Sequence, residues 1–309
     1  MGGHVIRLGF ALPQFGALAS QGDQVGRFAA EAERLGAWSL WVGDRLLAPV
    51  DPVVGYGGGT TVPPEFRSVL DPFALLTVAA TATKSAMLGS NVLNLPWYAP
   101  AVVARSLTTI DVVSGGRLIP GFGIGWSPDE YQAAGIPWRG RGARLEESLD
   151  ALEALWGPSP AEYEGDLLTV PKTHVDLRPV QKPRPPIYLG GMTEPALRRI
   201  GRRADGWLPV GAIPGRFSPE GVNRQREVIR EAAREAGREE DLPVVLRANV
   251  AAGTTVEQIA DALQTVAAGT GITDMFVDLM YLARDVDEAL DLVARLLTAI
   301  PPATEQGRS

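Results

Sequence analysis

Short apolar runs alternate with longer segments of helical periodicity along almost the whole chain, and this alternation constrains the fold more than any other feature. A short apolar run predicts a buried strand, and the amphipathic segment after it predicts a helix that crosses back to a parallel neighbour. We expect strands near Ile6–Leu12, Ala37–Val42, Met87–Leu93, Arg117–Phe122, Pro186–Gly190, Asp205–Val210, Val244–Val250 and Thr273–Leu279. Eight such units favour an α/β fold of the closed (β/α)8 TIM-barrel type over an open Rossmann sheet, which usually has about six strands and a glycine-rich first turn.

Each expected strand is followed by an expected helix. The helices are predicted at Gln21–Leu35, Asp71–Thr83, Pro100–Val113, Arg141–Leu155, Glu194–Arg203, Pro219–Ala236, Val256–Ala268 and Val286–Ile300. The pairs Asp71-Pro72 and Ser218-Pro219 place a polar N-cap before a proline at the first helical position, which is a common way for a helix to begin.

Two connections are too long to be simple turns. Residues 44–70 follow the second strand, on the side of a barrel where loops build active sites, so we expect a lid or binding element there. Residues 157–184 precede the fifth strand and alternate apolar with polar residues, which predicts a small hairpin. We expect one TIM-barrel domain over residues 1–300 with these two insertion loops, and a flexible tail over residues 301–309.

Composition excludes several classes of function. A net charge of −7 without a cluster of cations offers nothing to a nucleic-acid backbone or an anionic membrane, so we expect neither partner. There is no cysteine, and the histidines are His4 and His174, which argues against a metal site and a Ser-His-Asp triad. No secretory signal and no apolar run of membrane length is present, so a cytoplasmic location is expected.

Several motifs occur in an order that resembles the luciferase-like monooxygenase superfamily, including its coenzyme F420 (deazaflavin) dependent branch. They are Gly89–Pro96, Thr109–Arg117, Gly121–Trp126, Arg139–Arg141, Gly190–Gly201 and Ala204–Trp207. The resemblance implies an oxidoreductase with F420 or FMN at the carboxyl mouth of the barrel, a small-molecule substrate and a homodimer. It also implies a non-prolyl cis peptide bond at Asn91-Val92 behind the ring of the cofactor.

The cofactor-binding residues that the resemblance implies lie at the carboxyl ends of the second to fifth strands or in the segments after them. They are Asp44, Ser90, Asn91, Val92, Gly123, Gly125, Asp129, Gly190, Gly191, Met192 and Thr193. The stretch Gly190–Thr193 also suggests an anion site by itself, because free N–H groups at the start of a helix attract negative charge. An ordinary strand-to-helix turn is the alternative. The glycines of Gly121–Gly125 either leave bare backbone for a planar ring or keep the strand small for its neighbours.

The catalytic candidates are Asp44, Arg45, Trp126 and Arg247, and none of them has an assigned role. The resemblance implies that Arg45 stands where several deazaflavin-dependent relatives have histidine and Trp126 where one subgroup has glutamate. Arg247 and Asn249 share one face of the seventh strand and either point into the mouth or form a buried pair.

Three arginines at the start of the fourth helix need anionic partners, because the positive end of a helix disfavours them. They are Arg139, Arg141 and Arg144. We expect Glu130, Glu146 and Glu147 to pair with these arginines, and contact with the phosphate or acidic tail of the cofactor is the alternative.

Three functions follow from the resemblance and the residues. The first is hydride transfer between coenzyme F420 and a small organic substrate. The second is an FMN-dependent monooxygenase that uses reduced flavin and oxygen. The third is a barrel that binds a flavin without catalysis.

Aromatic residues in the loops after strands, among them Tyr56, Phe66, Trp126 and Trp138, suggest a partly apolar pocket.

Overall fold

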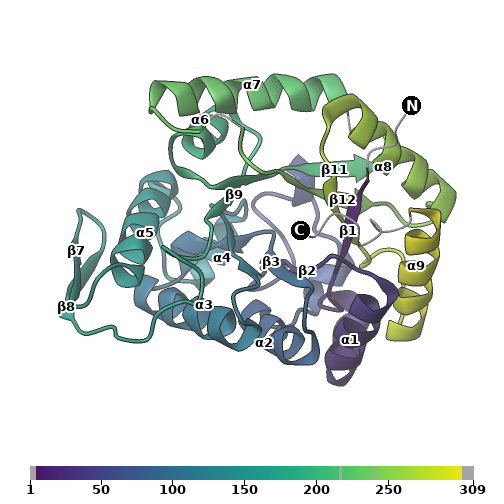
Figure 1. Ribbon diagram of the computed structural model, residues 1–309, viewed down its shortest axis with the longest axis horizontal. Coiled ribbons are helices and arrows are strands. Elements are labelled where there is room, and N and C mark those ends of the chain that lie inside the picture. The colour runs from purple at the N-terminus through teal and green to yellow at the C-terminus, as the bar shows by residue number, and fades with distance from the viewer. Residues whose placement is uncertain (1–4, 216–217, 240, 301–309) are drawn as a thin grey trace.

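A computed structural model describes residues 5–215, 218–239 and 241–300 of the chain. Parallel strands form a ring at its centre, and helices lie around the outside of the ring (Figure 1). The first strand pairs with the second on one side and with the last on the other, through registers such as Phe10 with Leu40 and Phe10 with Val277. Among the described residues, the hydrogen-bonded strands form a seven-stranded and a four-stranded sheet, which interrupted strands join into one ring, and the predicted (β/α)8 barrel is confirmed.

The ring contains eight strand positions, and three of them are interrupted. The strands are β1 (Arg7–Ala11), β2 (Ser39–Val42), β3 (Met87–Ser90) with β4 (Leu93–Asn94), β5 (Leu118–Ile119) with β6 (Gly121–Gly123), β9 (Tyr188–Gly190), β10 (Gly206–Leu208) with β11 (Val210–Ile213), β12 (Val245–Val250) and β13 (Asp274–Asp278). Pro120 and Pro209 cause two of the breaks, because proline has no N–H for the ladder. Both carbonyls still accept bonds from the neighbouring strand, from the Tyr188 and Arg247 N–H groups respectively.

The interrupted strands join the two halves of the ring. The first part of the fourth strand, β5, pairs with β3, and its second part, β6, pairs with β4 and β9. In the sixth position β10 pairs with β9, whereas β11 pairs with β12. The expectation of continuous strands over 87–93, 117–122 and 205–210 was wrong in this respect, although their positions were correct.

Helices follow the strands as expected. They are α1 (Val25–Leu35), α2 (Pro72–Ala82), α3 (Pro100–Ser114), α5 (Arg141–Trp156), α6 (Glu194–Arg203), α7 (Pro219–Glu235), α8 (Val256–Thr270) and α9 (Val286–Ala299), with a short additional α4 (Pro128–Ala133). The predicted caps are confirmed, because Asp71 accepts from the Ala74 N–H and Ser218 from the Gly221 N–H. The first helix begins later than expected, after the 3-10 helix η1 (Gly16–Gln24), since the side chain of Gln21 accepts from the Val286 N–H and the backbone of Gln21 is not helical.

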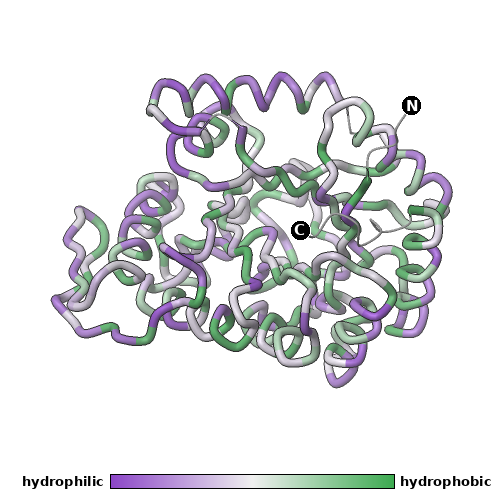
Figure 2. The backbone as a smooth tube through the Cα atoms, in the orientation of Figure 1, coloured by the Kyte–Doolittle hydropathy of each residue, from purple (hydrophilic) through white to green (hydrophobic). Residues whose placement is uncertain are grey.

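The apolar core has an inner and an outer part. Inside the ring, Trp41 stacks on Phe276 with ring centroids 4.8 Å apart, and Tyr188, Leu208 and Val245 pack beside them. Outside the ring, apolar helix faces cover the strands. Figure 2 shows hydrophobic residues along the central strands and hydrophilic residues along much of α7. No helix among the described residues is long and apolar enough to cross a membrane.

The two insertions take different positions. The predicted hairpin is present as β7 (Ala161–Glu164) and β8 (Thr169–Thr173), an antiparallel pair that lies outside α5 (Figure 1). The insertion 44–70 contains the 3-10 helices η2 (Tyr56–Gly58) and η3 (Pro64–Arg67). Its side chains Tyr56 and Phe66 pack with Trp126 and Met280, which follow the fourth and eighth strands. This insertion therefore covers part of the carboxyl mouth of the barrel. The predicted tail 301–309 lies outside the described residues.

Candidate active site

The third strand is interrupted at Asn91-Val92, where the peptide bond is cis as the resemblance implied. The side chain of Val92 lies between the fourth and fifth strands. A Cβ at Gly123 would stand 2.5 Å from Val92 Cγ2, and a Cβ at Gly190 would stand 2.8 Å from Val92 Cγ1. These two glycines make room for Val92. Of the two explanations offered for the glycines of Gly121–Gly125, the one in which a small strand residue leaves space for its neighbours accounts for Gly123.

Ser90 and Gly125, two other residues of the expected cofactor site, also have structural partners. The Ser90 hydroxyl donates to the Gly121 carbonyl and accepts from the Gly121 N–H, at 3.0 and 2.9 Å, which joins β3 to β6. Gly125 has a φ of 68° and faces the side chains of Asn94 and Trp97. A side chain at Gly125 would be strained in this left-handed conformation and would meet both neighbours.

Arg247 supports the interrupted third strand from across the ring. One of its terminal nitrogens donates to the Asn91 carbonyl at 3.1 Å, and the other forms an ion pair with Asp278 at the end of β13. On the same face of β12, Asn249 Nδ2 donates to the Tyr56 hydroxyl oxygen at 3.1 Å. Arg247 and Asn249 therefore both point into the mouth, but neither is bonded to the other.

Asp44 is a buried connection between the second strand and the segment after the third. Its Oδ2 accepts from the Asn94 N–H at 2.8 Å and its Oδ1 accepts from the Tyr98 hydroxyl at 2.9 Å. Burial raises the pKa of the Asp44 carboxyl to about 6, against the lowering effect of the Asn94 N–H and the Tyr98 hydroxyl. Both oxygens are thus engaged within the protein, and the geometry makes Asp44 a positioning residue.

Arg45 is enclosed by a carboxylate and two aromatic rings. Its Nη2 lies 2.5 Å from Glu130 Oε2, and both side chains are buried. The guanidinium carbon is 5.0 Å from the centroid of Phe66 and 4.4 Å from that of Trp126. Burial raises the pKa of the Glu130 carboxyl to about 7, although Arg45 opposes the shift. This cluster fastens the insertion 44–70 to the loop after the fourth strand.

Two further carboxylate contacts hold the same insertion. Glu130 Oε1 accepts from the N–H groups of Leu46 and Leu47, and Asp129 Oδ2 accepts from the Val53 N–H at 3.1 Å. In the structure Asp129 is therefore part of the attachment of the insertion.

A cavity of about 380 Å³ opens between the carboxyl ends of β6 and β9 and the first turns of α5 and α6. Its wall includes Trp126, the stretch Gly190–Thr193, Arg141 and Arg199. Thr193, the N-cap of α6, makes no side-chain capping bond, so the first N–H groups of α6 have no side-chain acceptor at that cap. Free N–H groups at a helix start attract anions.

Among the described residues, Arg141 is one of two arginines that line this cavity, and the other, Arg199, is paired with Glu146. The guanidinium carbon of Arg141 lies 3.7 Å from the centroid of the Trp138 ring, and its Nη1 donates to the Trp138 carbonyl. Its Nε is buried without a hydrogen-bond partner. A buried guanidinium N–H without an acceptor, beside an uncapped helix start, fits a bound phosphate group.

The expected ion pairs between α5 arginines and nearby glutamates were wrong. Glu130 pairs with Arg45, and Glu146 pairs with Arg199 and Arg203 of α6. Glu147 accepts from the Leu167 and Leu168 N–H groups in the hairpin. Partners from other elements compete for these carboxylates, and Arg144 instead donates to the Pro96 carbonyl.

The structure brings most of the expected residues to one end of the barrel and adds some that the sequence analysis missed. Gly190, Gly191, Met192 and Thr193 line the cavity together with Gly125 and Trp126. Asp278 and Arg199 were missed. Asp278 had the same signal as Asp44, a carboxylate at the carboxyl end of a strand, whereas Arg199 lies within an amphipathic helix and had none.

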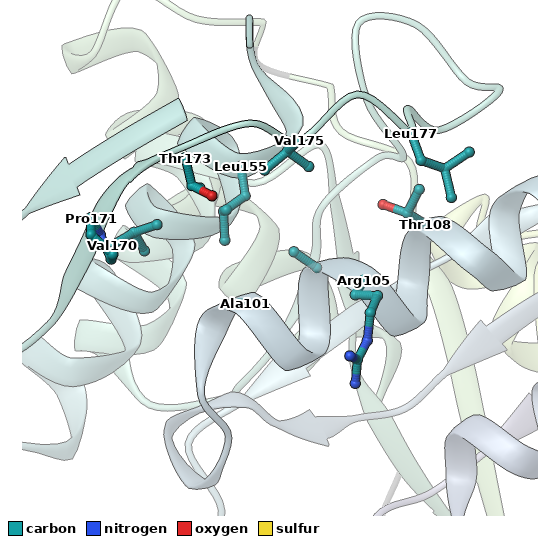
Figure 3. A pocket seen from close by; sticks show the side chains of 10 residues that line it. Ala101, Arg105, Thr108, Leu155, Val170, Pro171, Thr173, Val175 and Leu177 are labelled. Atoms are coloured by element: carbon teal, nitrogen blue, oxygen red, sulfur yellow. The ribbon is translucent and has the colours of Figure 1, made fainter. Parts of the chain in front are cut away.

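A second cavity, of about 430 Å³, lies between α3, α5 and the segment of β8, outside the ring of strands (Figure 3). Its lining is mostly apolar and includes Ala101, Leu155 and Val175. It shares no lining residue with the cavity at the mouth. The residues expected to bind a cofactor are all absent from it, so we place the candidate site at the mouth.

Comparisons with known proteins agree with the fold. The chain is 29% identical over 246 residues to phthiodiolone/phenolphthiodiolone dimycocerosates ketoreductase from Mycobacterium tuberculosis, a match over 77% of this chain and 63% of the relative. The match thus spans less than two thirds of the length of that relative.

Two solved structures have the same fold at low identity. An F420-dependent secondary alcohol dehydrogenase in complex with an F420-acetone adduct matches with a TM-score of 0.72 and 16% identity, over 96% of this chain and 99% of that chain. The oxygenating constituent of 3,6-diketocamphane monooxygenase from Pseudomonas putida, in complex with FMN, matches with a TM-score of 0.74 and 16% identity, over 97% and 100%. The family model described as luciferase-like monooxygenase matches residues 7–304. The chain therefore belongs to the luciferase-like monooxygenase family.

Proposed function

We propose that this protein is an oxidoreductase that transfers a hydride between coenzyme F420 and a small organic substrate at the mouth of the barrel. The observation that carries the proposal is the cavity at the mouth, which is lined both by Arg141 and by the uncapped start of α6. The names of the ketoreductase relative and of the F420-dependent dehydrogenase support the choice of reaction and cofactor.

The chain's own residues would hold the cofactor at two places. Gly190–Thr193 and Arg141 would bind its phosphate, and the interrupted strand at Asn91-Val92, supported by Arg247, would lie against its ring. When bound, the deazaflavin supplies a carbon centre that gives or takes a hydride. The protein's part is to orient the ring and to exclude water, for which the insertion 44–70 provides a cover of aromatic side chains.

An FMN-dependent monooxygenase is the second candidate, because the FMN-bound neighbour has the same fold and FMN also carries a phosphate. Titrating the purified protein with F420 and with FMN, and following the fluorescence of each ring, separates the two. We expect saturable binding of F420 and hydride exchange with a substrate. Tight binding of FMN without any response to F420 contradicts the proposal and favours the monooxygenase.

The phosphate site has its own test. We expect Arg141→Met to weaken cofactor binding at least tenfold, since one charge-assisted hydrogen bond contributes about 1.5 to 3 kcal/mol. Arg139→Met is the matched control, because Arg139 precedes the same helix but is exposed and does not line the cavity. Equal cofactor affinities for the two variants would argue against the phosphate site.

Binding of the cofactor without any reduction of it by a range of donors would instead support the third candidate, a barrel that binds a flavin without catalysis.

We further propose a homodimer that forms through α2 and α3. Val78 on α2 and Val102, Val112 and Val113 on α3 are each about two-fifths exposed. A row of exposed branched apolar side chains on adjacent helices is typical of a contact surface. Sedimentation of the wild type and of Val102→Lys tests this proposal, and a monomeric wild type would refute it.

A further inference from the structure

A polar pair lies in the mouth of the barrel, next to Trp126, which also lines the phosphate cavity. It consists of Tyr56 from the insertion 44–70 and Asn249 from β12. Asn249 Nδ2 donates to the Tyr56 hydroxyl oxygen at 3.1 Å, while Asn249 Oδ1 is buried without a hydrogen-bond partner. The pair therefore retains one free donor, the Tyr56 O–H, and one free acceptor, Asn249 Oδ1. Turning the amide over exchanges these roles but leaves one donor and one acceptor.

Apolar and aromatic side chains surround this pair. The ring of Tyr56 meets Phe66 edge-on, with centroids 5.1 Å apart, and Trp126 at 5.7 Å. Met280 belongs to the same cluster. A ligand that reaches the polar pair must therefore pass its remaining surface along aromatic and apolar groups, which favours an apolar body.

The cations beside the pair are already neutralised. Arg45, which lies against the rings of Phe66 and Trp126, is held by Glu130. Arg247, on the same face of β12 as Asn249, is held by Asp278. An anionic group at the pair would lose its hydration without gaining an unpaired cation, which is costly. This environment differs from that of Arg141, which has no carboxylate partner among the described residues.

We infer that Tyr56 and Asn249 bind the oxygen of a neutral substrate, a secondary alcohol or its ketone, whose apolar body lies against Phe66, Trp126 and Met280. An alcohol hydroxyl accepts from the Tyr56 O–H and donates to Asn249 Oδ1, and a ketone uses the first bond alone. This inference names the substrate class for the proposed function and rests on it. It excludes sugar phosphates and carboxylates as substrates at this position.

Calorimetry tests the inference by measuring the affinities of three compounds that each differ from the next in one chemical group. Each compound is measured with the protein free of cofactor and with the protein loaded with it. They are 1-phenylethanol, ethylbenzene, which lacks the oxygen, and 4-(1-hydroxyethyl)benzoate, which adds a negative charge. We expect 1-phenylethanol to bind most tightly. Tyr56→Phe should weaken its binding about tenfold, the effect of losing one buried hydrogen bond, and should leave ethylbenzene unchanged.

The matched control is Tyr163→Phe, which removes a tyrosine hydroxyl from the hairpin strand β7, outside the mouth. Asn249→Ala should weaken the binding of 1-phenylethanol as Tyr56→Phe does. It provides a second measurement if one of the two variants folds poorly. The inference is overturned if Tyr56→Phe binds the alcohol like the wild type, if the benzoate binds as tightly as the alcohol, or if the alcohol does not bind.

Cofactor affinity is measured separately by ring fluorescence, so the two proposals fail independently. Loss of cofactor binding with the expected order of probe affinities would refute the proposed function and leave the neutral site in place. Normal cofactor binding with no effect of Tyr56→Phe on the alcohol would refute the neutral site alone.

Discussion

Replacing the buried carboxylate of Asp44 by an amide tests how the mouth is held together. Asp44→Asn keeps the size of the side chain, and its amide oxygen still accepts from the Asn94 N–H. The Tyr98 hydroxyl, which donates to Asp44, turns to accept from the new amide. The substitution therefore removes a charge while it preserves the number of hydrogen bonds.

The size of the effect follows from the pKa of Asp44. Burial raises this pKa from the ordinary 3.8 to about 6 in the folded protein. Since one pKa unit corresponds to about 1.4 kcal/mol, a shift of roughly two units makes the ionised carboxylate cost about 3 kcal/mol of stability. Below pH 3.8 both states bind the proton and this cost is absent.

The sign determines the experiment. Between pH 3.8 and about 6 the unfolded chain releases the Asp44 proton while the folded chain retains it, so the stability of the wild type falls as the pH rises. Above about pH 6 the cost is constant. Asp44→Asn cannot titrate, so we expect the free energy of unfolding of the variant to gain about 2.5 kcal/mol on that of the wild type between pH 4 and pH 8, since part of the cost is already present at pH 4.

Urea denaturation of both proteins at intervals from pH 4 to pH 8 measures this difference, and other titrating groups cancel in the comparison. Asp51→Asn is the control, because it removes an exposed carboxylate from the same insertion. A difference that stays flat across this range, or one that changes in the opposite direction, would refute the assignment of Asp44 as a buried, desolvated positioning group.

Two other substitutions test the packing of the mouth. Gly123→Ala places a methyl group against Val92 and should lower the free energy of unfolding by about 1 to 3 kcal/mol. Val92→Ala in the same chain should restore most of this stability. If urea denaturation shows that the second substitution restores none of it, the contact between Gly123 and Val92 is contradicted. Arg45→Met leaves the buried Glu130 without its cation and should cost about 3 kcal/mol at pH 8. Adding Glu130→Gln should recover most of this loss, because it removes the unpaired charge while the amide oxygen still accepts from the Leu46 and Leu47 N–H groups. A double variant as unstable as the single one speaks against the buried pair.

The barrel could be predicted because each unit repeats the same local signals. A short apolar run, a polar cap such as Asp71 and a proline at the first helical position act within a few residues of each other, so the pattern determines the element. The breaks in the strands were missed for the opposite reason. Pro120 and Pro209 stand inside apolar runs, and the change of neighbour at each break depends on the closed ring, which is a tertiary property.

The partners of the charged residues were the least predictable part. Nearness in the sequence suggested that Glu146 pairs with the arginines at the start of α5, but Arg199 and Arg203 reach it from the neighbouring helix α6. The pair of Arg45 with Glu130 joins the insertion 44–70 to α4, two segments that are far apart in the chain. Such pairs follow from which elements are neighbours in the ring, and no local pattern contains that information.

These charge partners divide the mouth of the barrel into two electrical environments. Glu130 pairs with Arg45, and Glu146 pairs with Arg199 of α6. Arg141 therefore has no carboxylate partner among the described residues, and its side of the mouth attracts an anion. Near Asn249 each neighbouring arginine has its own carboxylate, so that side favours a neutral group. A phosphate-bearing cofactor would then be directed to the side of Arg141, because an anion gains an unpaired cation there and none beside Asn249, and the second side would remain open to an uncharged substrate.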